Sequence, residues 1–389
     1  MNVVMFSPHF PKNFQNFCLR LKAHGANVFG IADVSSELLE PSLQQSFTEY
    51  FQVSDLHNYD EILRICGYIT YKYGKIDRIE SHNEYWLEQD ADLRTDFNVP
   101  GIKADDIAYY KKKSLMKELF RKAKVPHAKG KVVETIEDAQ AFIEEVDYPV
   151  VVKPDIGVGA ANTYRLDNSE QLVQFFATKD SREYIMEEFI EGGICSFDGL
   201  VDQDGNLVFY TGHQYSQGIM ETVNEDRHVS YYSYRDLPED LKTLGLRLLK
   251  SFKVRERFFH FEFFRTPKSK LLVLEVNMRP PGGLTMDMFN YACDIDLYDV
   301  WTRMLTNQLD GLDYERKYHC CYIGRKFKHS YRYSHENILE HYGSKIAYHE
   351  PINSIFGAAL GDYGYLVRSE SLEELQEVVN YIQDTTDDH

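Results

Sequence analysis

The stretch LLVLEVNMRPPGG, residues 271–283, constrains the fold of this chain more than any other segment. Because side chains alternate along a strand, Glu275, Asn277 and Arg279 would share one face. The opposite face would carry Leu274, Val276 and Met278. A carboxylate, an amide and a guanidinium are costly to bury without partners. The segment therefore predicts either an edge strand whose polar face meets water, or a strand that presents a polar site beside a core.

The composition is that of a soluble globular protein. The chain has 389 residues, enough for two or three domains, with 43% hydrophobic and 27% charged residues. Its 43 Lys and Arg are outnumbered by 61 Asp and Glu, which gives a net charge of −18. Such a chain would repel a phosphate backbone, so we expect no nucleic-acid partner. A nucleotide is not excluded, because a local group of Lys and Arg can hold one.

The N-terminus and the cysteines predict a cytoplasmic protein with no membrane partner. The start, MNVVMFSPHF, has no basic region followed by a long apolar run, so we expect no signal peptide. No apolar stretch approaches the roughly 20 residues that span a bilayer. The six Cys are scattered without a CxxC pair, which favours reduced thiols over a disulfide framework or a zinc site.

The N-terminal region alternates predicted strands and helices. Strands are expected at 2–6, 26–33 and 75–81, and helices at 14–25 and 61–74. Such alternation predicts a parallel sheet covered on both faces. The first turn, SPHFPKN, lacks the glycines that a dinucleotide needs there, so we expect a Rossmann-like layer without a dinucleotide.

The rest of the chain has the pattern of an α+β protein. The basic run at 111–126 predicts a helix, and TIEDAQAFIEEV predicts another, with Thr135 and Asp138 in capping positions. Further strands are expected at 148–166, on both sides of a glycine-containing turn, and at 183–190, 196–214, 257–265 and 270–279. The C-terminal stretch predicts a hairpin and then a helix begun by Ser371.

Two carboxylates on neighbouring predicted strands are the strongest chemical signal. Glu275 lies 13 residues after Glu262, across the turn TPKS, a spacing that can pair them in an antiparallel hairpin. With Asn277 on the same face, the set offers hard oxygen ligands that suit Mg²⁺. Arg279 could hold an anionic oxygen in a planar fork.

Candidate phosphate donors lie earlier in the chain. Lys153 ends the run VVVK, and PDIGVGA follows with Gly157 and Gly159. Glycines let backbone N–H groups approach a phosphate closely. The turn lacks the GxxxxGK[ST] pattern, so on its own it is equally consistent with an ordinary surface hairpin.

Taken in order, these motifs resemble the ATP-grasp superfamily. The order is Lys113, then Lys153 with its glycine turn, then MEEFIEG, then Glu262, then EVNMRPPGG. The resemblance covers about residues 106–310 and is greatest to the carboxylate–amine (amino acid) ligase branch, with a biotin carboxylase-like domain order. It implies an N-terminal Rossmann-like (pre-ATP-grasp) domain at 1–105, a two-lobed ATP-grasp domain at 106–310 with a mobile lobe at about 125–190, and a small C-terminal α+β domain at 311–389.

The resemblance also implies roles for the residues that bind ATP. Lys113 and Lys153 would reach the phosphates, with Lys111 and Lys112 as alternatives to Lys113, and Lys153 would also act in catalysis. The residues that would cover the phosphates or hold the adenine are Gly157, Gly159, Glu187, Glu188 and Ile190. Where relatives carry a GxEYS-like stretch this chain has GGICSFDG, with Ile194 near the place of the glutamate. The contact to the ribose therefore stays open, with Glu191 as a candidate.

The reaction centre that the resemblance implies lies on the two predicted strands. Glu262, Glu275 and Asn277 would be the magnesium ligands, and Arg279 would face the reacting carboxylate or phosphate. The loop at 212–234 lies where relatives bind the acid substrate; its candidates are Glu221, Arg227 and His228, and a solvated loop is the alternative. His260 could either support the site or belong to a packed core.

The implied function is that of an ATP-dependent carboxylate–amine ligase. ATP would phosphorylate a substrate carboxylate, and an amine would attack the acylphosphate to give an amide, ADP and phosphate. The expected cofactors are ATP and two Mg²⁺, with Mn²⁺ as a substitute. The expected partners are a small-molecule acid and an amine, and homo-oligomerisation is left open. The alternatives are a carboxylase-like enzyme that phosphorylates bicarbonate, and a non-catalytic nucleotide-binding regulatory protein.

Overall fold

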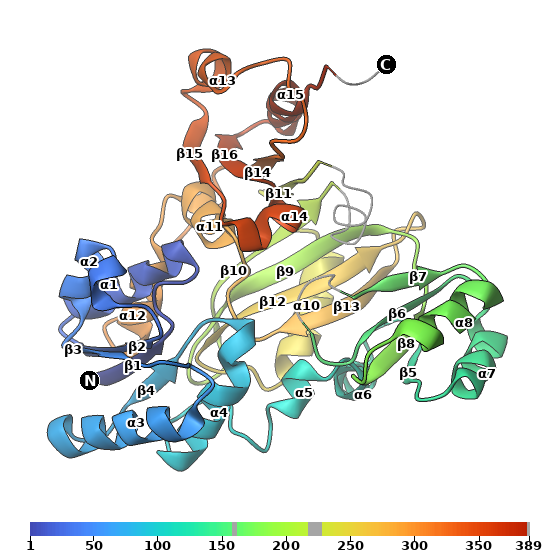
Figure 1. The fold of residues 1–389 in the computed structure, drawn as a ribbon. Helices are drawn as coiled ribbons and strands as arrows, with labels where there is room; N and C mark the ends of the chain where they lie inside the picture. Colours follow the sequence, from blue (N-terminus) through green and yellow to red (C-terminus); the bar gives the residue numbers. More distant parts are fainter. Residues whose placement is uncertain (158–161, 217–227, 387–389) are drawn as a thin grey trace.

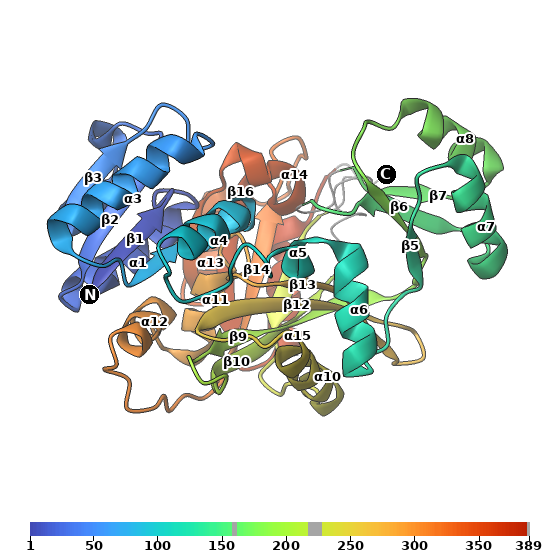
Figure 2. The ribbon, with the colours of Figure 1, turned by 90° about the horizontal axis from the view of Figure 1, so that it is seen from below.

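The computed structural model describes residues 1–157, 162–216 and 228–386 (Figure 1). Figures 1 and 2 show the N-terminal domain and a small helix-covered lobe at opposite sides of one large sheet. This mixed α/β architecture confirms the predicted fold class. No helix within the described residues is both long and apolar enough to cross a membrane.

The N-terminal domain is the parallel layer that the strand–helix alternation predicted. Its sheet has the order β3–β2–β1–β4, with all neighbours parallel. The elements are β1 (Asn2–Phe6), α1 (Gln15–Ala23), β2 (Asn27–Ala32), α2 (Pro41–Ser46), β3 (Glu49–Gln52), α3 (Tyr59–Tyr73), β4 (Arg78–Glu80) and α4 (Leu87–Asp96). The short 3₁₀ helices of the chain are η1 (Lys12–Phe14), η2 (Ser36–Leu38), η3 (Glu84–Trp86) and η4 (Ser354–Phe356). Every residue of β1 is buried, as expected for a parallel sheet covered on both faces.

The small lobe is an antiparallel sheet with two helices packed on it. The sheet has the order β5–β8–β6–β7. The elements of this part of the chain are α5 (Ala108–Lys111), α6 (Lys113–Ala123), β5 (Gly130–Val132), α7 (Ile136–Val146), β6 (Val150–Pro154), β7 (Tyr164–Leu166), α8 (Ser169–Thr178) and β8 (Tyr184–Glu188). Thr135 and Asp138 form the predicted capping box of α7. Phe142 of α7 and Phe175 of α8 belong to the core of this lobe.

The large sheet runs through the centre of the molecule in the order β13–β12–β9–β10–β11–β14–β16–β15. Its strands are β9 (Gly193–Val201), β10 (Leu207–Tyr215), β11 (Ser230–Ser233), β12 (Arg257–Arg265), β13 (Leu271–Asn277), β14 (His319–Arg325), β15 (Ile346–Pro351) and β16 (Tyr363–Ser369). The helices of this region are α10 (Glu239–Ser251), α11 (Thr285–Cys293), α12 (Leu297–Leu305), α13 (His335–Tyr342), α14 (Gly357–Leu360) and α15 (Leu372–Gln383). Because β11 pairs with β14, the strands after residue 310 extend this sheet. The domain limits themselves stay a prediction.

The two faces of the large sheet have different surroundings. One face packs against α6 and α10 through Phe197, Phe259 and Phe261. The other face packs against α11 and α12 at one end, where Phe258 of β12 lies in the core, and becomes polar further along the same strand at His260 and Glu262. The polar face therefore begins directly beside a packed core, which is one of the two arrangements that the sequence predicted.

The expected alternation along β13 is interrupted by a bulge. Glu262 pairs with Glu275, but the next residue of β12, Phe263, pairs with Val273, so Leu274 is the extra residue. Val273, and not Leu274, joins Val276 and Met278 in the core. The prediction that Leu274 faces the core was wrong because a bulge shifts the side-chain alternation by one residue, and nothing in the local sequence marks it.

The close packing of α10 on the sheet gives a test of the fold. A Cβ placed on Gly245 would lie 2.1 Å from Cδ1 of the buried Phe197. We expect Gly245→Ala to lower the free energy of unfolding by about 1–3 kcal/mol, because overpacking forces side chains off their rotamers. Gly67, in the middle of α3, has nothing within 4 Å of a built Cβ. We expect Gly67→Ala to raise stability by about 0.5–1 kcal/mol. Urea unfolding of both variants checks this, and equal effects at the two sites would contradict the packing.

Candidate active site

The two predicted glutamates lie opposite each other on neighbouring strands. In the pairing of β12 with β13, Glu262 is in register with Glu275, and His260 with Asn277. This confirms the hairpin predicted from the 13-residue spacing. The Glu262 and Glu275 side chains are 12% and 19% exposed. β13 is the end strand of the sheet, yet its polar face is largely enclosed, so an open edge strand does not describe it.

Lys113 begins α6 and reaches this pair of glutamates. Its Nζ lies 3.1 Å from Oε1 of Glu275 and donates to the carbonyl oxygen of Gly157 at 3.3 Å. Burial opposes the charged form of the lysine, but the Glu275 carboxylate raises the pKa of Lys113 above its ordinary value. Lys111 contacts Glu88 and the carbonyl oxygen of Glu84, and Lys112 contacts Glu183. Of the three lysines, Lys113 is therefore the one brought to the carboxylates.

Asp155 fixes the start of α6 to the segment that follows β6. Its carboxylate accepts hydrogen bonds from the Ser114 backbone N–H at 2.8 Å and the Ser114 hydroxyl at 2.7 Å. Its carbonyl oxygen accepts from the N–H of Lys113 at 3.0 Å. The beginning of the predicted glycine turn is thereby held beside Lys113. Gly157 lies at the end of the described segment, and Gly159 lies outside the described residues.

Lys153 is held by the buried carboxylate of Glu187. The Lys153 Nζ lies 2.7 Å from one oxygen of Glu187, and the Lys117 Nζ lies 2.6 Å from the other. Burial opposes ionisation of this carboxyl, but the two lysines lower the pKa of Glu187 to about 2. Glu188, the next residue, accepts a hydrogen bond from the backbone N–H of Lys129, and Ile190 follows the end of β8 half-buried. Glu187 thus serves as an anchor for lysines, a contact that sequence patterns did not predict.

Arg279 contacts a carboxylate of the N-terminal domain. Its Nε lies 3.4 Å from Oε2 of Glu84, at the start of η3, and its Nη1 donates to the carbonyl oxygen of Pro280 at 3.0 Å. Glu84 is buried, which raises its pKa, and Arg279 opposes that rise. Its Oε2 has no hydrogen-bond partner among the described residues. No sequence motif marks Glu84; the one signal is its place after the last strand of a parallel sheet, where ligands commonly bind.

Glu262 belongs to a network of buried hydrogen bonds within the large sheet. His260 contacts Asp198 through Nδ1 at 2.5 Å and Glu262 through Nε2 at 3.0 Å. Asp198 also accepts from His213 Nδ1 at 2.7 Å and from the Ser196 hydroxyl at 2.6 Å. Burial would lower the pKa of His260, but the two carboxylates raise it to about 9. The pKa of Asp198 stays well below its usual range because the histidines outweigh the effect of burial.

The donor set fits a magnesium ion. No group of three or more His, Cys, Asp or Glu side chains within the described residues is arranged to hold a metal. The predicted set, however, consists of two carboxylates and the amide of Asn277, all oxygen donors on one enclosed face. Mg²⁺ is commonly bound by one or two carboxylates together with phosphate oxygens and waters. The contact of Lys113 with Glu275 also indicates that this position holds a positive charge readily.

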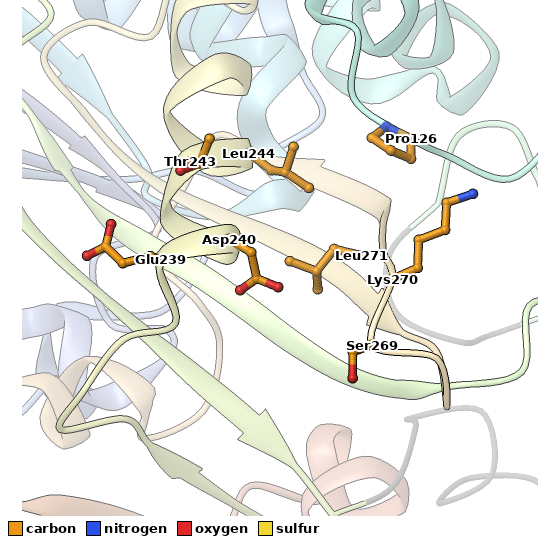
Figure 3. Close-up of a pocket in the computed structure, with 8 residues that line it drawn as sticks. All are labelled: Pro126, Glu239, Asp240, Thr243, Leu244, Ser269, Lys270 and Leu271. Carbon is orange, nitrogen blue, oxygen red and sulfur yellow. The ribbon is translucent and has the colours of Figure 1, made fainter.

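Figure 3 shows the residues that line one hollow of the structure. It has a volume of about 450 Å³ and lies beside the start of α10 and the turn between β12 and β13. Its lining residues are Pro126, Glu239, Asp240, Thr243, Leu244, Ser269, Lys270 and Leu271. Asp240 is paired with Arg265, and none of the predicted site residues lines the hollow. We therefore do not assign it to the nucleotide.

The remaining candidates are only partly described. Glu221 and Arg227 lie outside the described residues. The ring of His228 lies 4.9 Å from that of His329 in the C-terminal region. Ile194 lies in β9, and its carbonyl oxygen accepts a hydrogen bond from the Gln214 side chain, whereas Glu191 is exposed just before this strand.

Part of the chain matches a known family and a curated protein. Residues 146–287 match the family model described as an ATP-grasp domain. The L-arginine-specific L-amino acid ligase of Bacillus subtilis is 25% identical over 237 residues, which cover 59% of this chain and 57% of that protein. The match therefore spans a little more than half the length of this curated relative.

Solved structures share the fold over nearly the whole chain. The L-amino acid ligase from Bacillus licheniformis has a TM-score of 0.73 at 14% identity, covering 97% of this chain and 96% of that one. The biotin carboxylase domain of the Hydrogenobacter thermophilus 2-oxoglutarate carboxylase, in complex with MgADP and bicarbonate, has a TM-score of 0.71 at 16% identity, covering 97% and 89%. The family match therefore indicates an ATP-grasp domain over residues 146–287, and the solved structures show that the fold is shared.

Proposed function

We propose that this chain is an ATP-dependent carboxylate–amine ligase. The observation that carries the proposal is the contact between Lys113 and Glu275, because it joins a lysine suited to nucleotide phosphates with a carboxylate suited to magnesium. The likeness to an L-arginine-specific L-amino acid ligase supports a small-molecule acid and an amine as the substrates.

The nucleotide would lie between the small lobe and the large sheet. Lys113 and Lys153 would bind its phosphates, and the segment with Gly157 and Gly159 would cover them. Backbone groups near Glu188 and Ile190 would hold the adenine. Closure of the lobe at about 125–190 would exclude water from a reactive acylphosphate.

The chemistry needs positioned charge more than a nucleophilic side chain. An oxygen of the substrate carboxylate attacks the γ-phosphorus of ATP, the bond to the β–γ bridging oxygen breaks, and ADP leaves. The amine nitrogen then attacks the acyl carbon, phosphate leaves, and the nitrogen loses a proton to give the amide. Arg279 would hold the carboxylate oxygen that is phosphorylated, and the two lysines would balance charge on the phosphates.

Glu262, Glu275 and Asn277 would hold the magnesium, for which we propose two ions. When bound, Mg²⁺ would supply positive charge that offsets the negative charge developing on the phosphates. The carboxylates contribute by fixing its place at the large sheet, opposite the lysines of α6 and β6.

A second candidate is a carboxylase-like enzyme that phosphorylates bicarbonate. It is favoured by the likeness to a biotin carboxylase domain described with MgADP and bicarbonate, whose TM-score is close to that of the amino acid ligase. Bicarbonate would then take the place of the substrate carboxylate beside Arg279.

Release of ADP and phosphate separates these functions. The protein is incubated with Mg-ATP and pooled amino acids or other acids, pooled amines, both pools together, or bicarbonate. We expect phosphate release only when acid and amine are both present. Release with bicarbonate alone would support the carboxylase, and stabilisation by Mg-ATP without release in any mixture would support a non-catalytic nucleotide-binding protein.

The anchoring of Lys153 predicts a defined effect of pH on stability. Glu187→Gln leaves two buried lysines without their counter-charge, so we expect it to lower the free energy of unfolding by about 3–5 kcal/mol at neutral pH. Because the pKa of Glu187 is depressed to about 2, its stabilising effect is complete above the unfolded carboxyl pKa of about 4.3 and is lost as pH falls toward 2. Urea unfolding at several pH values should show that the difference in free energy of unfolding between wild type and variant becomes smaller below that pKa.

The matched control is Glu145, whose contact with Lys129 is 3.0 Å long but exposed. We expect Glu145→Gln to change stability by less than about 1 kcal/mol. If Glu187→Gln changed the free energy of unfolding only slightly, or if the difference from wild type grew as the pH fell, the two lysines would not need this carboxylate for stable burial.

Substitutions of Arg279 separate the binding of ATP from its turnover. We expect Arg279→Ala to bind Mg-ATP nearly as well as wild type and to turn over more slowly by a factor on the order of 10² or more, since it removes one preorganised contact to the transition state. Arg279→Lys keeps the charge but loses the planar fork, and should recover only part of the rate. Nucleotide titration and a coupled assay of ADP release measure the two properties.

Arg265→Ala provides the comparison, because Arg265 also contacts a carboxylate, that of Asp240, outside the candidate site. It should leave turnover close to wild type. If Arg279→Ala turned over at the wild-type rate once the substrates are known, Arg279 would be a structural partner of Glu84 only.

A further inference from the structure

We propose that Asp198 and His260 are positioning residues that hold the carboxylate of Glu262 in the orientation needed to bind the metal. The inference rests on the proposed function, in which Glu262 is a magnesium ligand. It concerns two residues that take no direct part in the proposed chemistry.

The three side chains lie on two neighbouring strands, β9 and β12, near the β13 end of the large sheet. His260 lies opposite Asp198 in the pairing of β12 with β9, and Glu262 lies two residues further along β12 on the same face. The Nδ1 of His260 contacts Oδ1 of Asp198 at 2.5 Å, and its Nε2 contacts Oε1 of Glu262 at 3.0 Å. The imidazole therefore bridges the buried aspartate and the candidate ligand.

Asp198 is held from two further sides. Its other oxygen accepts hydrogen bonds from His213 Nδ1 on β10, at 2.7 Å, and from the hydroxyl of Ser196 on its own strand, at 2.6 Å. The side chains of Asp198 and His213 are fully buried. With both oxygens engaged inside a packed sheet, Asp198 has a single orientation, and so has the imidazole that contacts it.

These contacts restrict the orientation of the Glu262 carboxylate toward a metal. A carboxylate held through one oxygen cannot rotate freely, but it keeps its second oxygen for a metal. Side chains that hydrogen-bond to a metal-ligating residue fix the orientation of that residue. Removing them typically lowers metal affinity by 10- to 100-fold. The same contact helps to offset the desolvation of a Glu262 side chain that is only 12% exposed.

A packed-core role for His260 does not account for these contacts. A core position is filled at lower cost by an apolar residue, and replacing buried ion pairs by hydrophobic residues is often neutral or stabilising. Here both ring nitrogens of a buried histidine contact carboxylates, and the histidine lies directly behind a candidate ligand. Directing that ligand explains the contacts, whereas filling space does not.

The test measures metal affinity without turnover. Mn²⁺ is titrated into the protein in the presence of ADP, and free Mn²⁺ is followed by its electron paramagnetic resonance signal. We expect His260→Leu to raise the Mn²⁺ dissociation constant by roughly 10- to 100-fold. In His260→Gln the side-chain amide can take the place of Nε2 as the donor to Glu262, so this variant should recover part of the loss. Asp198→Asn, which keeps the shape but removes an acceptor, should also weaken binding.

A double-mutant comparison separates positioning from a general loss of structure. In a Glu262→Gln background, His260→Leu should cause little further loss of Mn²⁺ affinity, because the residue through which it acts is already altered. His24→Leu is the matched control. It removes a His–Asp contact of 2.7 Å between the residue that follows α1 and Asp299 of α12, away from the site, and should leave Mn²⁺ affinity unchanged.

The possible results have distinct meanings. If wild type binds Mn²⁺ with ADP and both His260→Leu and Asp198→Asn bind it equally well, the inference is overturned and the proposed function stands. Equal losses in the wild-type and Glu262→Gln backgrounds would also overturn it, because the effect would then not pass through Glu262. If wild type itself binds no Mn²⁺ with ADP, the proposed metal site fails, and the inference fails with it.

Discussion

The contact between Lys113 and Glu275 joins parts of the chain on which the rest of the site depends. Glu275 belongs to the end strand of the large sheet, and Lys113 begins the helix that leads into the small lobe. Burying either charge alone would be unfavourable, so each requires the other in this place. Asp155 adds a second connection, because it fixes the segment after β6 to the same helix start. These polar contacts connect the small lobe to the glutamates, in addition to the apolar packing of α6 on the large sheet.

The N-terminal domain contributes to the same centre through Glu84. This domain lacks the glycine-rich turn of a dinucleotide-binding layer. The 3₁₀ helix η3, which follows β4, instead places the buried Glu84 3.4 Å from Arg279. Arg279 also follows β13, so one guanidinium lies between the end of the large sheet and the edge of the parallel sheet. A substrate carboxylate held by Arg279 would therefore lie between the two domains. This arrangement gives the N-terminal layer a role in the proposed reaction that needs no cofactor of its own.

Sequence patterns predicted the parts of the fold and site that depend on local periodicity. The strand–helix alternation predicted the parallel sheet, and the spacing of Glu262 and Glu275 predicted their pairing. The bulge at Leu274 was not predictable from β13 alone. Which residue remains unpaired in a bulge depends on the pairing with the neighbouring strand, here β12. Asp198 and Glu84 were missed for a related reason. Each is an isolated acidic residue in sequence, and only the register of β9 with β12, or the packing of one domain on another, brings it to the site.

On the proposed function, the ion pairs of the site exchange partners when the nucleotide binds. Lys113 and Lys153 now contact Glu275 and Glu187, and the phosphates of ATP would offer them negative charge of the same kind. Glu275 would lose its contact with Lys113 and would instead contact the magnesium ion that binds with the nucleotide. The desolvation of these groups is already part of the folded structure, so binding would replace one set of charge contacts by another instead of creating buried charges anew. Glu187 differs from Glu275 in contacting two lysines, which lets it keep Lys117 while Lys153 turns to a phosphate. The asymmetry assigns Glu187 to the permanent framework and Glu275 to the part of the site that responds to the nucleotide.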